Sequence, residues 1–327
     1  MAERRQRRHQ KSLGGPNPYE GLESPKITIS REDSETKETI RVANPEAAAE
    51  KAKELLKAQR ESVDTLTMVK EKILDKLSDT EFRQELETNG YGVVDHLLGD
   101  TKHSNSPILS ELLEETKVML EHGDMEIDQA NLGKGQYIAA IGGGEKLYGL
   151  CPRLVEFVVS TTKHVPEAFG APKDDKNDNN DDSNDNYVPS VLELCDSACM
   201  ATLRSFDRQN LKASLELLKV EDEDAFLNND EVPCSVIADA NDQRKLSLFY
   251  YIVPPDWNKN MDCGGGLVLQ NEFYTVQIFA VPDRLLVVYS DTKKCKPAPW
   301  RGNDNNATSG NVLELHLIGK RESKPQK

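Results

Sequence analysis

The second half of the chain consists of short apolar runs, and this pattern constrains the fold more than any other feature. Seven runs follow residue 190, most of them separated by Gly, Pro, Asn or Asp: VLELC, ACMATLRSF, KLSLFYYIV, GGLVLQ, FYTVQIFAV, RLLVVYS and VLELHLIG. They are rich in Val, Leu, Ile, Tyr and Phe, and no long helical pattern separates them. Such runs predict two antiparallel sheets packed as a sandwich or jelly roll. Leu211 to Asn229 is charged and indicates an inserted helix or loop.

The first half of the chain has helical patterns. Asn44-Pro45 predicts the start of a long helix that continues to about Leu77. Ser78 with Glu81 resembles a capping box, which opens a short helix that stops near Asn89-Gly90. The remaining predicted elements are a strand and turn from Tyr91 to Gly99, a helix from Pro107 to about Glu121, strands in DMEID and GQYIAAI, and a helix from Pro152 to about Val165. The predicted fold class is α+β, with a double-stranded β-helix (jelly roll, cupin-like) core packed against N-terminal helices.

Two segments lack the apolar residues that a core requires. Residues 1–43 predict a disordered basic and polar tail, and Lys173 to Asn186, KDDKNDNNDDSNDN, predicts a disordered insertion. The Asp and Asn residues of the insertion invite a calcium-loop interpretation. An EF-hand loop, however, requires a central Gly and a closing Glu, and the insertion has neither. We therefore expect a folded domain at 78–320, preceded by the helix 44–77 and followed by a tail at 321–327.

Composition restricts partners and location. The net charge is -15 and the isoelectric point is about 5.0, which disfavours nucleic acid as a partner. No apolar run is long enough to span a membrane, so we expect no membrane partner. Six cysteines without CxxC spacing predict reduced thiols and an intracellular protein, cytoplasmic or nuclear. The basic cluster Arg4, Arg5, Arg7, Arg8 and Lys11 is either a solvated tail or a nuclear address.

Several segments together resemble one enzyme family. They are RKLSLFYYIVPPDW, CGGGLVL and VPDRLLVVYSD between Arg244 and Asp291, with NGYGVVDHLLGD and GQYIAAIGGGE earlier in the chain. In this order they resemble the prolyl 4-hydroxylase branch of the Fe(II)- and 2-oxoglutarate-dependent dioxygenases, especially the oxygen-sensing prolyl hydroxylases. The resemblance covers roughly residues 80 to 320. It implies hydroxylation of a prolyl side chain, with Fe(II), 2-oxoglutarate and ascorbate as cofactors if the chain is active.

The resemblance also implies a metal site that this sequence does not keep. The family holds Fe(II) with a His-x-Asp pair and a distal His, and leaves positions open for 2-oxoglutarate and oxygen. Asp239 matches the carboxylate, but Ile237 and Lys296 occupy the two His positions. Ser309 stands at the usual position of the arginine that binds 2-oxoglutarate, and Arg301 is a candidate to replace it from a loop.

These replacements change the charge of the implied site. Ile237 has no lone pair for a metal, and Lys296 is a cation at pH 7. We therefore hypothesise that Lys296 neutralises Asp239 directly, in place of the metal.

Other candidate ligands have more ordinary interpretations. His122, in the string His122-Gly123-Asp124, reads as a histidine at a helix C-terminus, and His316 as a packed core residue. Cys295 reads as an ordinary thiol without metal-ligand partners. Gly142 to Gly144 and Gly264 to Gly266 lack the context of phosphate loops and predict strand ends and tight turns.

Three functions remain open from the sequence. The chain is a diverged dioxygenase-fold protein that has lost or reduced catalysis and binds a protein or peptide, in which case no cofactor is expected. Alternatively, it is an active 2-oxoglutarate-dependent peptidyl-prolyl hydroxylase with an unusual iron site. A further alternative is an unrelated β-sandwich scaffold.

Overall fold

The computed structural model describes the residues that build the folded part of the chain. They are 65–99, 107–142, 145–170, 190–228, 244–257, 263–270, 275–290, 294–304 and 308–321. The predicted tails, the Asp/Asn-rich insertion and the first part of the predicted helix 44–77 lie outside these residues. The predicted domain boundaries therefore stay predictions.

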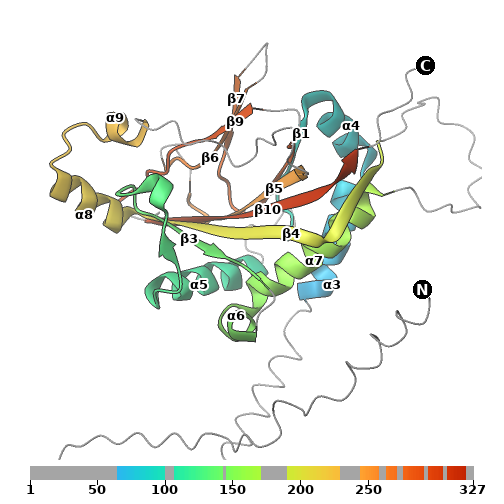
Figure 1. Ribbon diagram of the computed structural model, residues 1–327, viewed down its shortest axis with the longest axis horizontal. Coiled ribbons are helices and arrows are strands. Elements are labelled where there is room, and N and C mark those ends of the chain that lie inside the picture. The colour runs from blue at the N-terminus through green and yellow to red at the C-terminus, as the bar shows by residue number, and fades with distance from the viewer. Residues whose placement is uncertain are drawn as a thin grey trace, which may run out of the picture. The chain divides into compact units, whose positions relative to one another are not determined.

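Two antiparallel sheets form the centre of the described structure (Figure 1). The larger sheet has the strand order β1-β8-β5-β10-β4-β3-β2, and the smaller one has the order β7-β6-β9. The strands are β1 Tyr91–Val94, β2 Glu126–Ile127, β3 Gln136–Ala140, β4 Leu192–Asp207, β5 Arg244–Ile252, β6 Gly266–Gln270, β7 Thr275–Phe279, β8 Arg284–Tyr289, β9 Lys294–Pro297 and β10 Ser309–Arg321.

The chain passes back and forth between the two sheets. β5 lies in the larger sheet, β6 and β7 in the smaller, β8 in the larger, β9 in the smaller and β10 in the larger. This alternation, with β4, β10, β5 and β8 adjacent, is the strand arrangement of a jelly roll. The predicted fold class, α+β with a jelly-roll core, is confirmed.

Two strand predictions need correction. VLELC and ACMATLRSF form a single long strand, β4, which pairs with β10 along nearly its whole length. The polar residues between the two runs suggested a turn, but long-range pairing with β10 keeps the backbone extended. β9 was not predicted, because its sequence KCKP lacks the β-branched and aromatic residues that mark a strand.

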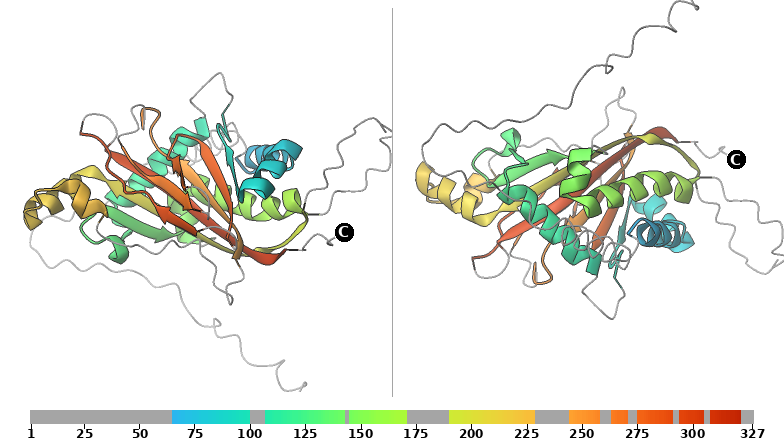
Figure 2. Two further views of the ribbon diagram at one scale, coloured as in Figure 1. Left: turned by 90° about the horizontal axis from the view of Figure 1, so that it is seen from above. Right: turned by 90° about the horizontal axis from the view of Figure 1, so that it is seen from below.

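Helices cover the face of the larger sheet that points away from the smaller sheet (Figures 1 and 2). Three of them, α3, α5 and α7, contribute apolar side chains to one core cluster with that face. The helices are α3 Thr65–Leu77, α4 Thr80–Asn89, α5 Pro107–Glu121, α6 Glu145–Leu150, α7 Pro152–Phe169, α8 Arg208–Leu218 and α9 Glu223–Asn228. Among the described residues, no helix has both the length and the apolar character that a membrane crossing requires.

The helix ends differ in detail from the predicted ones. The N-cap of α4 is Asp79, whose carboxylate accepts from the Phe82 amide, so the predicted capping residue Ser78 was one position early. The helix ends at Gly90 in the left-handed conformation, as predicted. α7 continues through Pro166 to Phe169, because packing of its apolar face on the sheet outweighs the local cost of proline. The segment 211–229 contains most of α8 and all of α9.

Side-chain alternation along the strands separates two cores. On β10, Leu313, Leu315 and Leu317 face the helices, whereas Val312 faces the smaller sheet. On β5 the neighbours Tyr250 and Tyr251 are divided in the same way, with Tyr251 between the sheets. Successive side chains of a strand point to opposite faces, so every second residue of β4, β5 and β10 points into the space between the sheets.

The glycines before β6 form a tight turn. Gly264, Gly265 and Gly266 have φ of 71°, 74° and 97°, in the left-handed region that favours glycine. A Cβ at Gly266 would lie 2.1 Å from the Ile278 carbonyl oxygen, so no larger residue fits. The turn predicted from the sequence is confirmed here.

Asp283 joins the turn before β8 to the segment after β1. Its carboxylate accepts from the Leu98 amide at 3.0 Å, from the Gly99 amide at 2.8 Å and from the Tyr250 hydroxyl at 2.7 Å. Its backbone is left-handed, with φ of 57°. Burial raises the pKa of Asp283 above its ordinary value of 3.8, although these three hydrogen bonds act in the opposite direction.

We expect Asp283→Asn to lower the free energy of unfolding by about 1–3 kcal/mol, because it weakens hydrogen bonds to buried donors. The folded pKa of Asp283 lies above the unfolded one. The stability of the wild type relative to the variant is therefore greatest below about pH 3.8 and declines as the pH rises through the folded pKa. Urea denaturation of both proteins over a pH series measures the difference. A difference that does not change with pH would contradict this assignment.

Candidate functional site

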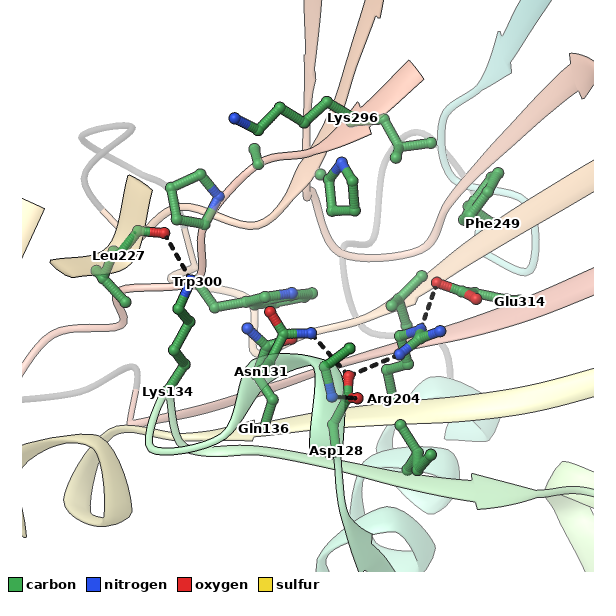
Figure 3. A pocket seen from close by; sticks show the side chains of 18 of the residues that line it. Asp128, Asn131, Lys134, Gln136, Arg204, Leu227, Phe249, Lys296, Trp300 and Glu314 are labelled. Atoms are coloured by element: carbon green, nitrogen blue, oxygen red, sulfur yellow. Dashed lines mark hydrogen bonds and ion pairs between the residues drawn. The ribbon is translucent and has the colours of Figure 1, made fainter. Parts of the chain in front are cut away.

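A cavity of about 200 Å³ lies between the two sheets (Figure 3). Its floor comes from β4, β5 and β10, one wall from the segment between η1 (Gln129–Asn131) and β3, and another from β6 and the segment after β9. The end of α9 also contributes. The lining residues used below are Asp128, Lys134, Arg204, Leu227, Phe249, Tyr251, Leu267, Lys296, Pro297, Pro299, Trp300, Val312 and Glu314.

One arginine bridges two buried carboxylates on the cavity floor. Arg204 Nη1 donates to Asp128 Oδ2 at 2.8 Å, and Arg204 Nε donates to Glu314 Oε1 at 2.8 Å. The exposed fractions of these side chains are 27% for Arg204, 5% for Asp128 and 9% for Glu314. Figure 3 shows the guanidinium between the two carboxylates. We call these three residues the floor trio.

Local structure holds the floor trio in place. Arg204 and Glu314 lie on the adjacent strands β4 and β10, at positions whose side chains point between the sheets. Asp128 caps η1: its Oδ1 accepts from the Ala130 amide at 3.0 Å, and its Oδ2 accepts from Asn131 Nδ2 at 2.8 Å. The trio carries one positive and two negative formal charges, so the floor of the cavity favours neutral or cationic groups over anions.

The beginning of β10 has no room for a long side chain toward the cavity. A Cβ at Gly310 would lie 2.7 Å from Trp300 Cζ3 and 2.8 Å from Trp257 Cη2. The two indole rings pack together, with centroids 5.6 Å apart. Between Gly310 and His316, the residues of β10 with this orientation are Gly310, Val312, Glu314 and His316, and none of these four is an arginine or a lysine.

Tyr251 is buried against the cavity with an unsatisfied hydroxyl. Within the described residues, three buried side-chain polar atoms have no hydrogen-bond partner: Thr161 Oγ1, Thr162 Oγ1 and Tyr251 Oη. Of these residues, Tyr251 lines the cavity. Burial, and secondarily the charge of Glu314, raise the pKa of Tyr251, so its hydroxyl keeps its proton. The neighbouring Tyr250 hydroxyl is satisfied by Asp283 at 2.7 Å.

Two lysines lie on the cavity walls. Lys134 is buried, and its ammonium group donates to the Leu227 carbonyl at 3.2 Å. Lys296, at a predicted site position, lies on β9 with an exposed side chain. In Figure 3 its ammonium group points away from Arg204 and Glu314.

The other predicted site residues are separated. Ile237 and Asp239 lie outside the described residues, so the hypothesis that Lys296 pairs with Asp239 stays a prediction. Ser309 begins β10 on the same face as Leu313, which is the helix side, and does not line the cavity. Arg301 pairs with Asp224 of α9 at 3.0 Å and does not line the cavity either.

The histidine interpretations agree with the structure. His316 is buried, and its Nδ1 lies 2.8 Å from Ser247 Oγ, which in turn lies 2.7 Å from Ser290 Oγ. It is a packed core residue, as predicted. His122 is exposed, directly after the end of α5.

Cys295 does not agree with its interpretation. It is disulfide-bonded, whereas Cys151 and Cys263 are in no disulfide, so the prediction of six reduced cysteines was wrong. The spacing of cysteines along a sequence shows only local pairs. It does not show which distant cysteines the fold brings together.

No group of three His, Cys, Asp or Glu side chains with metal-binding geometry occurs among the described residues. On β9, the strand implied to carry the distal ligand, the buried side chain is Cys295. Its sulfur is in a disulfide and is not available as a thiolate ligand. The next residue, Lys296, offers an ammonium group that has no lone pair when protonated.

Sequence analysis missed the residues that form the cavity: Asp128, Arg204, Tyr251 and Glu314. Alternation along VLELHLIG and ACMATLRSF would have pointed to Glu314 and Arg204, as charged residues at inward positions of apolar strands. No sequence signal connects Asp128 with them, because the contact spans 76 residues.

Neither a family model nor a curated protein matches the sequence. Solved structures do resemble the chain. One is a prolyl hydroxylase from Trichoplax adhaerens in complex with a peptide fragment of the hypoxia inducible factor oxygen degradation domain. Its TM-score is 0.47 and its identity 20%, over 75% of this chain and 90% of that one.

Two further examples are prolyl 4-hydroxylases. The enzyme from Phytophthora capsici has a TM-score of 0.46 and 17% identity, over 76% of this chain and 65% of that one. The enzyme from Pseudomonas putida has a TM-score of 0.41 and 12% identity, over 75% of this chain and 99% of that one. Solved prolyl hydroxylases are therefore among the structures to which this chain is similar, at TM-scores below 0.5. Similarity this low says nothing about ligands or catalysis.

We expect Arg204→Met to lower the free energy of unfolding by about 3 kcal/mol at pH 7, because two buried carboxylates lose their shared cation. Chemical denaturation at pH 7 measures it. The double variant Arg204→Met/Glu314→Leu should recover part of the loss. If the single variant is as stable as the wild type, the ion pairs of the floor trio contribute little to the free energy of unfolding.

Proposed function

We propose that this chain is a diverged protein of the Fe(II)/2-oxoglutarate dioxygenase fold that binds a protein or peptide and no longer catalyses hydroxylation. The observation that carries the proposal is the floor trio, which places two carboxylates and one already paired cation at the floor of the cavity. Two fit tests, for iron and for 2-oxoglutarate, support it.

The residues do not fit iron. A facial Fe(II) site requires two imidazoles and one carboxylate. In this sequence Ile237 and Lys296 stand where the imidazoles belong. On β9 the buried alternative, Cys295, is oxidised, and Lys296 is exposed. Asp239 would be the remaining ligand of the implied set.

The residues do not fit 2-oxoglutarate either. A dicarboxylate requires a free cation, which the family supplies from its final strand. Here the inward residues of that strand are Gly310 under two tryptophans, Val312, and the acid Glu314. Arg204 is the nearest guanidinium on the floor, but it is held between two carboxylates. A dianion entering the cavity would meet the net negative charge of the floor trio, and the two lysines, Lys134 and Lys296, lie on the walls rather than on this floor.

An exposed apolar surface beside the cavity supports a protein or peptide partner. Leu132, Leu217 and Leu218 are 64%, 81% and 57% exposed. A Cβ at Gly133, next to Leu132, would lie 3.7 Å from Leu218 Cδ1, so Leu218 lies against the turn that carries Leu132. It adjoins α9, whose last residues line the cavity. Contiguous exposed apolar residues of this kind are typical of interaction sites.

Anaerobic titration with Fe(II) and 2-oxoglutarate tests the loss of catalysis. A bidentate complex of 2-oxoglutarate on Fe(II) gives a weak visible band at roughly 500 nm only if the facial site exists. We expect no band at any ratio of the two ligands. A saturable band would instead establish the alternative, an active hydroxylase with an unusual iron site.

Glu314→Gln should raise the affinity for 2-oxoglutarate by about tenfold, equivalent to about 1.4 kcal/mol, because it removes one negative charge and releases one contact of Arg204. Fluorescence of Trp300, which lines the cavity, provides the readout. Glu126→Gln is the matched control, since it makes the same change at an exposed position outside the cavity. Equal affinities for 2-oxoglutarate in the wild type and both variants would show that the charge of Glu314 does not decide which ligands the cavity accepts.

A further inference from the structure

We propose that the exposed leucines around the end of α8 bind an amphipathic segment of a partner protein, with apolar residues on one face and lysine or arginine beside them. This inference rests on the proposed function and specifies the chemistry of its partner. It concerns the surface outside the cavity.

Three leucines lie around the C-terminal end of α8. Leu217 and Leu218 are the last two residues of this helix, and a Cβ at Gly133 would lie 3.7 Å from Leu218 Cδ1. Leu132, the neighbour of Gly133 in the chain, therefore lies near the same helix end. We call Leu132, Leu217 and Leu218 the leucine surface, and more than half of each side chain is exposed.

Core packing does not account for Leu217. The side of α8 that faces the protein carries Leu211, which is buried, and Leu215, which packs against the core between the sheets. Residues two apart on an α-helix differ in direction by about 200°. Leu217 therefore points away from the side that Leu215 packs, and its side chain is available to a partner.

Acidic residues give the leucine surface its charge. Glu216 precedes Leu217, and Glu221 and Asp222 follow the helix, all three with exposed side chains. Asp222 caps α9, since its Oδ1 accepts from the Ala225 amide at 3.0 Å. Lys219 is the exposed cation between them, and within the described part of the chain no ion pair involves Glu216, Lys219 or Glu221.

The other cations near this surface do not reverse its charge. Three of them form ion pairs with three carboxylates of the same region: Arg208 with Glu223 and Asp304, Lys212 with Asp304, and Arg301 with Asp224. Lys134 follows the turn of Leu132, but it is buried and donates to the Leu227 carbonyl. Three carboxylates and one ammonium then remain around the leucines, so the surface attracts cations.

This charge selects among the partners that an apolar surface accepts. An anionic membrane would be repelled by the carboxylates. A second copy of the chain would bring the same carboxylates into a twofold contact, which their repulsion disfavours. A segment with apolar residues flanked by lysine or arginine complements both the leucines and the charge.

The test uses three short fluorescein-labelled peptides and the full-length protein. The first is an amphipathic helix of leucine and lysine, and the second has glutamate in place of lysine. The third has the composition of the first in an order that gives no apolar face. Fluorescence anisotropy measures their affinities. We expect the leucine–lysine helix to bind saturably, and about tenfold or more tightly than either of the others.

Leu132→Ser/Leu217→Ser removes the two most exposed side chains of the leucine surface. It should weaken binding of the leucine–lysine helix by about tenfold or more. The melting temperature should stay that of the wild type, because neither side chain is buried. Val159→Ser is the matched control, since Val159 is 48% exposed on α7, and it should leave the affinity unchanged.

Glu216→Gln/Glu221→Gln tests the charge. It should weaken the leucine–lysine helix by about fivefold at low salt and reduce the dependence of the affinity on salt. Glu85→Gln/Glu114→Gln makes the same change of charge at exposed positions of α4 and α5. This control should leave the affinity within about twofold of the wild type, because those carboxylates lie elsewhere.

The same measurements identify two other occupants of the leucine surface. Self-association of the wild type that Leu132→Ser/Leu217→Ser abolishes, measured by sedimentation, would make the occupant a second copy and overturn the inference. An affinity that rises about tenfold when the basic tail loses its charge would make that tail the occupant and overturn it as well. The variant for this measurement is Arg4→Gln/Arg5→Gln/Arg7→Gln/Arg8→Gln.

Three further results would overturn the inference: equal binding of the glutamate peptide, binding that Leu132→Ser/Leu217→Ser does not weaken, or no binding of the leucine–lysine helix. None of these restores catalysis, so the loss of hydroxylation would stand if the Fe(II) and 2-oxoglutarate titration stays negative. A positive titration would remove the proposed function itself.

Discussion

The bridge that Arg204 forms between Asp128 and Glu314 determines what the rest of this fold can do. It joins β4, β10 and the η1 segment in the space between two sheets. Buried carboxylates persist only when paired, so each member of the floor trio requires the others. Because Arg204 is paired in this way, it is not an unpaired cation that a dicarboxylate could bind.

The jelly roll around this trio is built on strict alternation. Leu313 and Leu315 of β10 are buried under the helices, whereas Val312 and Glu314 point toward the cavity. On β5, Tyr250 lies on the helix side and Tyr251 on the cavity side. One face of the larger sheet therefore forms the main apolar core with the helices, and the other face lines the cavity. Substitutions on the cavity face therefore leave the core under the helices unchanged.

The fold was predictable because apolar periodicity and turn residues are local signals. Pro107–Glu121 and Tyr91–Val94 appear as expected, and Gly264 to Gly266 form the predicted turn. The errors came from long-range effects: pairing with β10 joins two runs into β4, and Cys295 is in a disulfide bond that local spacing does not predict. For the site, the sequence predicted a degenerate metal centre from Ile237 and Lys296, and this stays a prediction because Ile237 lies outside the described residues. The replacement contacts of Arg204 depend on tertiary structure and leave no spacing in the sequence.

The most direct measurement of this account is a crystal structure of protein soaked anaerobically with Fe(II) and 2-oxoglutarate, with data collected at the iron absorption edge. The account predicts no anomalous peak between the sheets, and Arg204 still bound to both Asp128 and Glu314. It is contradicted by iron held by three protein donors, or by Arg204 turned from its carboxylates toward a bound dicarboxylate.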